Sequence, residues 1–259
     1  MNPDVEAAIR AAKAAGEIAL ASFRTGLAVE TKADRSPVTE ADRASERKIV
    51  EVLRAHDPDC GFLGEESGEE SAGARRRWII DPIDGTKSFV RGIPFFATLI
   101  ALEEDGELTA GVIYAPATGS LLYGARGQGV RDESGREVRV SGVASLSAAM
   151  ISFGGLQAFR RHGYWRAFEA LVSETARQRG FGDYLGSEMV IRGWSEAMLE
   201  LDVKPWDLAP LKLLVEEAGG RLTDFTGRAT IYGGSALVTN GRIHDAVLDL
   251  LREKRITGD

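Results

Sequence analysis

The stretch that decides the fold is WIIDPIDGTKSF, from Trp78 to Phe89. Three large apolar residues lead directly into two aspartates, Asp81 and Asp84, followed by a glycine and a threonine. Asp-Gly is a common hairpin signal, but the next apolar run starts about ten residues later, which excludes a tight hairpin. Helix capping would explain one aspartate but not both. Clustered carboxylates repel unless a proton or a cation bridges them, so a divalent metal site is the other explanation of the pair.

Composition sets the broad class of protein. The 259 residues can bury a core as one large domain or two intimate halves. A net charge of −7 without a basic stripe predicts no nucleic-acid partner. The N-terminal apolar stretch is interrupted by charges, and no run approaches the roughly 18 apolar residues of a membrane span, so we expect no membrane partner. Cys60 is the single cysteine, which fits a reducing cytoplasm. The three histidines are expected on the surface and are given no role: His56, His162 and His244.

Hydrophobic periodicity predicts helices and strands in mixed order, without repeats or an obvious linker. The predicted helices cover residues 1–23, a segment capped by Thr39 that buries Ile49, Val52 and Leu53, and then 158–179, a segment after Asp183, 206–220 and 243–253. The predicted strands are 76–81, an antiparallel meander of 95–103, 109–116 and 120–125, a short hairpin around 133–135, and then 148–153, 195–201, 221–225 and 236–240. Residues 61–68 are predicted to form a turn bounded by glycines.

Three further acidic residues each have a structural explanation. Glu65, in GEES, belongs to an acidic loop that continues beyond it. Asp42 stands three residues after Thr39 and completes a capping box. Asp207 fits a helix N-cap, because Pro210 would then lie in the first turn, where proline is tolerated. A capping carboxylate keeps one oxygen for a metal, so the two explanations are compatible.

Together these segments resemble the inositol monophosphatase family, the lithium-sensitive, magnesium-dependent phosphomonoesterases. The resemblance rests on GEES at 64–67, DPIDGT at 81–86 and WD at 206–207 followed by EEAGG at 216–220, and it runs from about residue 7 to 251. It implies an α/β fold like that of fructose-bisphosphatases, an αβαβα sandwich of mixed and antiparallel sheets. It also implies two to three Mg²⁺ per active site and a homodimer. The order of the predicted elements themselves places a boundary near residue 140, with approximate subdomains 1–140 and 141–259.

Carried over by position, the resemblance assigns oxygen donors to the metal ions: Glu65, Asp81, Asp84, Asp207, the carbonyl of Ile83 and, for a third and weaker ion, Asp42. Oxygen ligands of this kind suit Mg²⁺ far better than Zn²⁺. Thr86, with Glu65, is implied to orient and deprotonate the attacking water. The N–H groups of Gly85 and Thr86 are implied to bind the phosphate. Lys32 is near the position of a family lysine beside the metals, or is a solvated loop residue.

The substrate is expected to be a small phosphorylated metabolite, and the branch nearest in sequence is that of histidinol-phosphate phosphatases. The segment RGFGDYLGSEMVIRG, residues 179–193, carries that likeness. Glu200 is implied to face the leaving group, and Asp183 would add a second carboxylate suited to a cationic amino alcohol. A helix N-cap is the structural alternative for Asp183. The alternatives for the activity are an inositol-1-phosphate phosphatase, a 3′-nucleotide or sugar phosphatase, and a binding protein that has lost catalysis.

Overall fold

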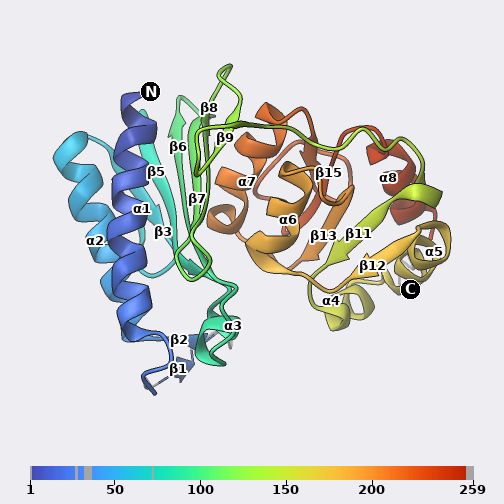
Figure 1. The fold of residues 1–259 in the computed structure, drawn as a ribbon, viewed down its shortest axis with the longest axis horizontal. Coiled ribbons are helices and arrows are strands. Elements are labelled where there is room, and N and C mark those ends of the chain that lie inside the picture. The colour runs from blue at the N-terminus through green and yellow to red at the C-terminus, as the bar shows by residue number, and fades with distance from the viewer. Residues whose placement is uncertain (1, 27–28, 32–36, 72, 255–259) are drawn as a thin grey trace. The chain divides into compact units, whose positions relative to one another are not determined.

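The computed structural model describes residues 2–26, 29–31, 37–71 and 73–254 of the chain. The chain is an α/β sandwich of mixed and antiparallel sheets with helices packed on them, as the sequence predicted (Figure 1). It divides into two compact units, Met1–Glu137 with Ala209–Leu214 and Val138–Leu208 with Val215–Asp259. Among the described residues, none of the helices combines the length and the apolar character needed to cross a membrane.

An eight-stranded sheet forms the centre of the first unit. Its strands, in the order in which they are hydrogen-bonded, are β10 (Glu137–Val138), β9 (Val130–Asp132), β8 (Ser120–Ala125), β7 (Glu107–Ala115), β6 (Ala97–Glu104), β5 (Arg76–Asp84), β3 (Gly61–Gly64) and β4 (Gly68–Glu70). β3 and β5 are parallel, whereas β5 to β9 pair antiparallel, which confirms the predicted meander. A separate antiparallel pair joins β1 (Glu30–Thr31) to β2 (Pro37–Val38).

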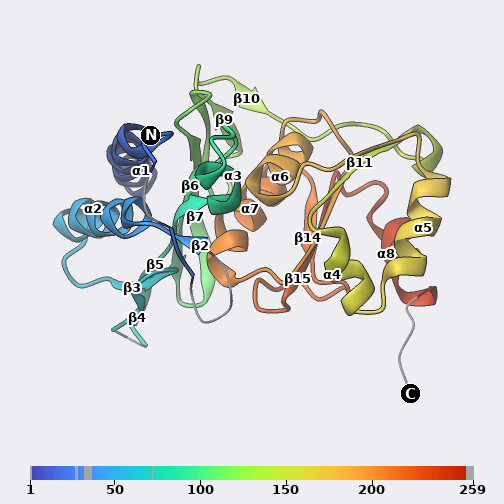
Figure 2. The same cartoon turned by 90° about the horizontal axis from the view of Figure 1, so that it is seen from below.

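Two helices, α1 (Pro3–Ser22) and α2 (Glu40–His56), lie side by side on one face of this sheet (Figures 1 and 2). The buried stripe of α1 consists mainly of alanines, whose small side chains let the helix approach the strands closely. At Gly16 a Cβ atom would lie 2.6 Å from the ring of Tyr114, so only glycine fits there. α2 buries Ile49 and Leu53 completely, as predicted, while Val52 is only partly buried.

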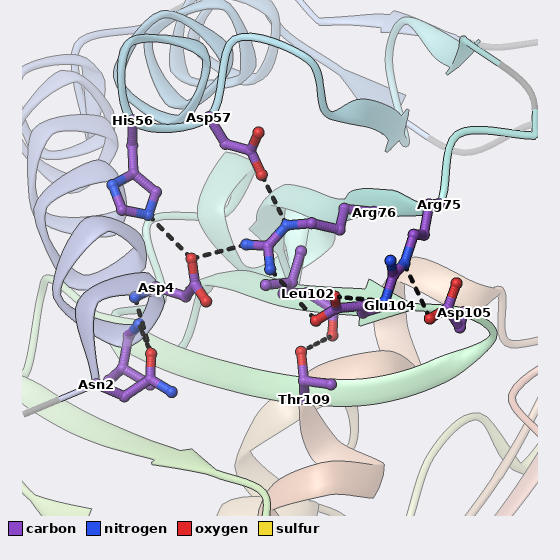
Figure 3. Close-up of polar contacts among 11 residues, drawn as sticks. Asn2, Asp4, His56, Asp57, Arg75, Arg76, Leu102, Glu104, Asp105 and Thr109 are labelled. Carbon is purple, nitrogen blue, oxygen red and sulfur yellow. Dashed lines mark hydrogen bonds and ion pairs between the residues drawn. The ribbon is translucent and has the colours of Figure 1, made fainter.

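Arg76, at the start of β5, links α1, the end of α2 and β6 in one ion-pair network (Figure 3). Its guanidinium donates to Asp4 at 2.9 Å, to Asp57 at 2.8 Å and to Glu104 at 3.3 Å. Asp4 also contacts Nε2 of His56 at 2.9 Å. These side chains are partly buried, so the network fixes both helices to the start of β5. Asp81 and Asp84 lie at the other end of the same strand.

A five-stranded mixed sheet forms the centre of the second unit. The strands, in spatial order, are β12 (Arg177–Arg179), β11 (Met150–Phe153), β13 (Ala197–Leu201), β15 (Ser235–Thr239) and β14 (Arg221–Thr223). The helices of this part of the chain are α4 (Leu156–Arg161), α5 (Trp165–Glu174), α6 (Asp183–Ile191), α7 (Pro205–Glu217), which crosses into the first unit, and α8 (His244–Glu253), with a short 3₁₀ helix at Leu146–Ala148.

Helices cover both faces of this second sheet (Figure 1). Side chains of α4, α5 and α8 pack with Ile151, Leu199 and Leu237 in one apolar core. α6 lies on the opposite face, where a Cβ at Gly186 would meet the sulfur of Met198 at 2.6 Å. The sheet that carries Glu200 is therefore held rigidly from both sides.

Two predicted elements differ from the structure. The predicted helix 158–179 is broken, because Gly163 takes a left-handed φ of 78° between α4 and α5, and its last residues form the strand β12. The predicted turn 61–68 is a strand, a tight turn and a second strand, because Gly61–Gly64 pairs with both β4 and β5. Backbone pairing with neighbouring strands decides both outcomes.

His244 contradicts the prediction that the histidines lie on the surface, because its side chain is 0% exposed. Its Nδ1 lies 2.9 Å from the hydroxyl of Thr239 and its Nε2 lies 3.1 Å from that of Thr223. Thr223 gives its own proton to the carbonyl of Asp224, so it accepts from Nε2–H, and Nδ1 accepts from Thr239. Burial, together with the charge of Arg221, lowers the pKa of His244 to about 4.

Candidate active site

A β-bulge brings Asp81 and Asp84 to the same face of β5. Asp81 pairs with Leu99 of β6 and Asp84 pairs with Ala97, so β5 contains one extra residue between them. Residues three apart in a regular strand point to opposite faces, and the extra residue cancels that difference. Pro82 is tolerated because a bulge leaves part of the ladder unpaired. The two aspartates are 2% and 8% exposed, and each offers a carboxylate oxygen within 4.8 Å of the other.

The loop that follows is fixed by its own hydrogen bonds. The N–H of Ile83 donates to Oδ1 of Asp81 at 3.0 Å, and the hydroxyl of Thr98 donates to the carbonyl of Pro82 at 2.9 Å. The hydroxyl of Thr86 lies 3.0 Å from the carbonyl of Ile83. A carbonyl oxygen accepts two hydrogen bonds or one hydrogen bond and an ion, so this contact is compatible with the predicted role of Ile83.

An apolar cluster anchors the loop from below. The side chain of Ile83 is buried in a cluster that includes Phe89 and Phe96. Phe23, the C-cap residue of α1, packs against this cluster. The three rings lie 4.9 to 5.7 Å apart, and Phe89 and Phe96 meet edge to face. Such pairs add stability beyond the area they bury, so the carbonyl of Ile83 is held by a rigid support.

Gly85, Thr86 and Asp42 connect this loop to α2. Gly85 takes a left-handed φ of 84°, which favours glycine, and precedes α3 (Thr86–Val90). Asp42 is 1% exposed, and its Oδ2 accepts the N–H and the hydroxyl of Thr39 at 2.8 and 2.6 Å, which confirms the predicted capping box. Its other oxygen, Oδ1, lies 3.4 Å from the hydroxyl of Thr86. Burial raises the pKa of the Asp42 carboxyl, and the hydrogen bonds from Thr39 oppose that rise.

Glu65 follows β3 directly and is tied to β5. The N–H of Glu65 donates to the carbonyl of Ile80 at 3.1 Å, and the last parallel pair before it is Gly64 with Ile80. The next residues in this register are Glu65 and Asp81. The negative charge of Glu65 is one of the causes that raise the pKa of Asp42, so the two carboxylates lie near each other. The structure therefore brings Asp42, Glu65, Asp81 and Asp84 to one end of β5.

Asp207 lies in the first turn of α7, in the third helical position and not at the predicted N-cap. Its Oδ2 accepts the N–H of Lys204, just before the helix, at 2.8 Å. Pro210 accordingly lies inside the helix, beyond its first turn. Residues Ala209–Leu214 of the same continuous helix belong to the first unit. Asp207 joins the aspartate pair in a group of three acidic side chains that could hold a metal ion, and this all-oxygen donor set fits Mg²⁺.

The two acidic residues predicted to contact the substrate, Glu200 and Asp183, are neighbours in the second unit. Glu200, near the end of β13, is half-buried, and its Oε2 accepts the N–H of Asp183 at 3.1 Å. Asp183 is the first residue of α6, not its N-cap, and takes a left-handed φ of 54°. A Cβ at Gly154 would lie 2.7 Å from the carboxyl carbon of Glu200, and one at Gly182 would lie 3.4 Å from its Oε1. The absence of a side chain at Gly154 and Gly182 therefore leaves room for the carboxylate of Glu200.

One predicted site residue, Lys32, is not among the residues that the structure describes. Two other residues near the predicted site were not predicted from the sequence. Glu46 and Gly154 were not singled out in the sequence, because the strand was predicted to end at residue 153 and residues 61–68 were predicted as a turn. Cys60 is buried, and burial raises the pKa of its thiol to about 11, so it is not a nucleophile at neutral pH.

Comparison with known proteins places this arrangement in a family. The model of the inositol monophosphatase family matches residues 1–255. A histidinol-phosphatase of Mycobacterium tuberculosis is 43% identical over 255 residues, which cover 96% of this chain and 98% of that protein. The solved structure of the extragenic suppressor protein suhB from Bartonella henselae has a TM-score of 0.90 at 33% identity, covering 96% of this chain and 98% of its own. The IMPase of Thermotoga maritima has a TM-score of 0.86 at 34% identity, with 95% of each chain covered.

The fold, the acidic group and these relatives define the chain as a phosphoric monoester hydrolase. More particularly, the chain belongs to the inositol monophosphatase family.

Proposed function

We propose that this protein is a Mg²⁺-dependent phosphatase that hydrolyses L-histidinol phosphate to L-histidinol and phosphate, as in histidine biosynthesis. The observation that carries the choice of substrate is the hydrogen bond from the backbone N–H of Asp183 to Oε2 of Glu200, which puts two acidic residues next to each other in the second unit. The relative from M. tuberculosis that bears the name histidinol-phosphatase supports the same choice.

Asp81, Asp84 and Asp207 would hold magnesium, with Glu65 and the carbonyl of Ile83 completing the ligands and Asp42 serving a third, weaker ion. Two or three ions per site follow from the family likeness. Bound Mg²⁺ supplies positive charge that offsets the negative charge of the phosphate as it is attacked. Without a cation, two buried carboxylates with oxygens within 4.8 Å would repel each other, which is why the aspartate pair supports this assignment.

The residues of the chain would handle the proton of the attacking water. The hydroxyl of Thr86 has one proton and two acceptors, Ile83 and Asp42, so its lone pairs remain for a hydrogen bond from water. Glu65 would take the proton of that water as general base. Asp42 would hold the Thr86 hydroxyl in the orientation that accepts the hydrogen bond from the water. The N–H groups of Gly85 and Thr86 would bind the phosphate oxygens, and Lys32 would add positive charge beside them.

Electrostatics favours histidinol phosphate over inositol phosphate. Histidinol carries an ammonium group, and an ammonium between two carboxylates gains from both charges. Inositol is neutral and accepts or donates hydrogen bonds only, so a second carboxylate adds little to its binding. Glu200 alone would also bind the hydroxyls of a neutral polyol, and the likeness to the T. maritima IMPase keeps inositol 1-phosphate as the second candidate substrate.

A phosphate-release panel tests the proposal. Histidinol phosphate, inositol 1-phosphate, fructose 1,6-bisphosphate and a 3′-nucleotide would be compared at equal Mg²⁺. We expect the highest kcat/KM for histidinol phosphate, loss of activity with a chelator, and inhibition by lithium. A preference for inositol 1-phosphate would replace the proposed substrate. Absence of phosphate release from every ester would refute the proposed activity.

We also propose that the protein is a homodimer. The support is the family likeness and three apolar side chains in and after α3 that are exposed in the single chain: Val90, Ile93 and Phe95. Light scattering after size exclusion should give twice the mass of 27.9 kDa. A monomer at micromolar concentration would contradict this proposal and leave the catalytic one intact.

A further inference from the structure

A buried carboxylate on α2 holds the turn that carries Glu65. Glu46 is 3% exposed. Its Oε2 accepts the N–H of Glu66 at 2.9 Å, and its Oε1 accepts the N–H of Ser67 at 2.8 Å. A buried carboxylate without hydrogen bonds is costly, and here two backbone donors of one turn meet that need. The side chain of Glu46 thus bridges α2 and the turn between β3 and β4.

Gly64 makes this bridge possible. A Cβ atom at position 64 would lie 2.6 Å from the carboxyl carbon of Glu46 and 2.6 and 2.7 Å from its two oxygens. Real Cβ contacts are not this short, so any other residue would displace the carboxylate or the turn. Gly64 does not take a left-handed backbone conformation. The glycine is therefore required by the close approach of Glu46 and not by a turn geometry.

The residue between these contacts is Glu65. Its own N–H is bound to the carbonyl of Ile80 at 3.1 Å, so the residues before and after it and its own backbone are all fixed. We propose that Glu46 is a positioning residue for the metal site, because it fixes the backbone on which the Glu65 carboxylate is mounted. This inference rests on the proposed function, in which Glu65 binds magnesium.

A purely structural role for Glu46 makes a different prediction. If the bridge served only to join α2 to the sheet, its loss would lower stability but leave the affinity of the folded protein for Mg²⁺ unchanged. If it positions Glu65, the folded variant would bind Mg²⁺ more weakly, because its ligand would sample other orientations. Metal affinity well below the melting temperature therefore separates the two roles.

The test uses two independent changes. Glu46→Gln keeps the shape but turns an N–H₂ group toward a backbone N–H. Gly64→Ala does not change the residue at position 46, but the added Cβ would force the Glu46 carboxylate away from the N–H groups of Glu66 and Ser67. Glu51→Gln is the matched control, since Glu51 is exposed on the same helix and pairs with Lys48. Titration calorimetry on metal-free protein would give the Mg²⁺ affinity, and the Mg²⁺ dependence of turnover would give the concentration for half-activation.

We expect Glu46→Gln and Gly64→Ala each to weaken Mg²⁺ binding and raise the half-activating concentration by about tenfold or more. Glu51→Gln should match the unaltered protein. Unchanged Mg²⁺ affinity in folded Glu46→Gln and Gly64→Ala would overturn the inference, as would failure of both variants to fold. If the unaltered protein itself does not bind Mg²⁺, the proposed function fails instead.

Discussion

Asp81 and Asp84 lie on one face of β5 because that strand has one more residue between them than β6 has between their partners. The bulge converts a spacing of three, which alternation would separate, into a pair of adjacent carboxylates. Neither side chain contributes apolar contact to the core. The pair is therefore expected to serve a bound cation at the cost of some stability.

Asp84→Asn should lower kcat by about 100-fold or more while leaving the fold intact, because it removes one charge from the proposed ion without changing side-chain volume. Phosphate release at saturating Mg²⁺ measures the effect, and a circular dichroism melt checks the fold. Asp59→Asn, at an exposed carboxylate of the same unit, is the control. Turnover close to normal in Asp84→Asn would contradict the metal assignment.

Asp183→Asn should reduce kcat/KM for histidinol phosphate by about tenfold and spare inositol 1-phosphate, because only the ammonium substrate gains from the second charge. Asparagine tolerates the left-handed backbone at this position, so the change isolates the charge. Asp202→Asn is a matched control, since Asp202 has a φ of 63° in the same unit. Equal losses for both substrates would count against a charge-based preference.

Gly154→Ala should raise KM for histidinol phosphate by about tenfold, because the added Cβ would displace the carboxylate of Glu200. The neighbouring Gly155 is the matched control, since a Cβ there would have no atom within 4 Å. Steady-state kinetics on Gly154→Ala and Gly155→Ala should show an effect in the first variant alone. Similar KM values in both would mean that the position of Glu200 does not limit binding.

His244 should make stability depend on pH between about 6.5 and 4. Its pKa is lower in the folded than in the unfolded protein, so the unfolded state binds more protons in this range and stability falls as the pH falls. A shift of this size corresponds to on the order of 3 kcal/mol at the acid end. Urea unfolding of the unaltered protein and of His244→Gln should give different slopes against pH.

Local patterns predicted the elements whose signals are contained in their own residues. The capping box of Thr39 and Asp42, the N-terminal helix α1 and the meander β6 to β8 are examples. β12, with the sequence RQR, has no apolar alternation and is a strand only because β11 offers it backbone partners. α4 ends at Arg161, and Gly163 just after its C-cap is a local sign of that end, since glycine often follows a helix.

In the site, too, local sequence signals predicted some features and missed others. The acidic residues were predicted by their motifs. The bulge, the support of Ile83 and the bridge from Glu46 to the turn after Gly64 depend on pairing and packing between distant segments. His244 was misplaced because its burial depends on two threonines, Thr223 and Thr239, that the sequence does not mark as its partners. Contacts of this kind have no periodic signature.

The course of α7 has a practical consequence for dissecting the protein. Residues Ala209–Leu214 belong to the first unit, while the chain on both sides of them belongs to the second. Any single cut after Glu137 would therefore leave the N-terminal fragment without the helical segment whose Leu213 and Leu214 pack on Gly111 and Gly124. Recombinant halves divided at that point are not expected to be independently soluble modules, and fragment complementation would have to supply both pieces together.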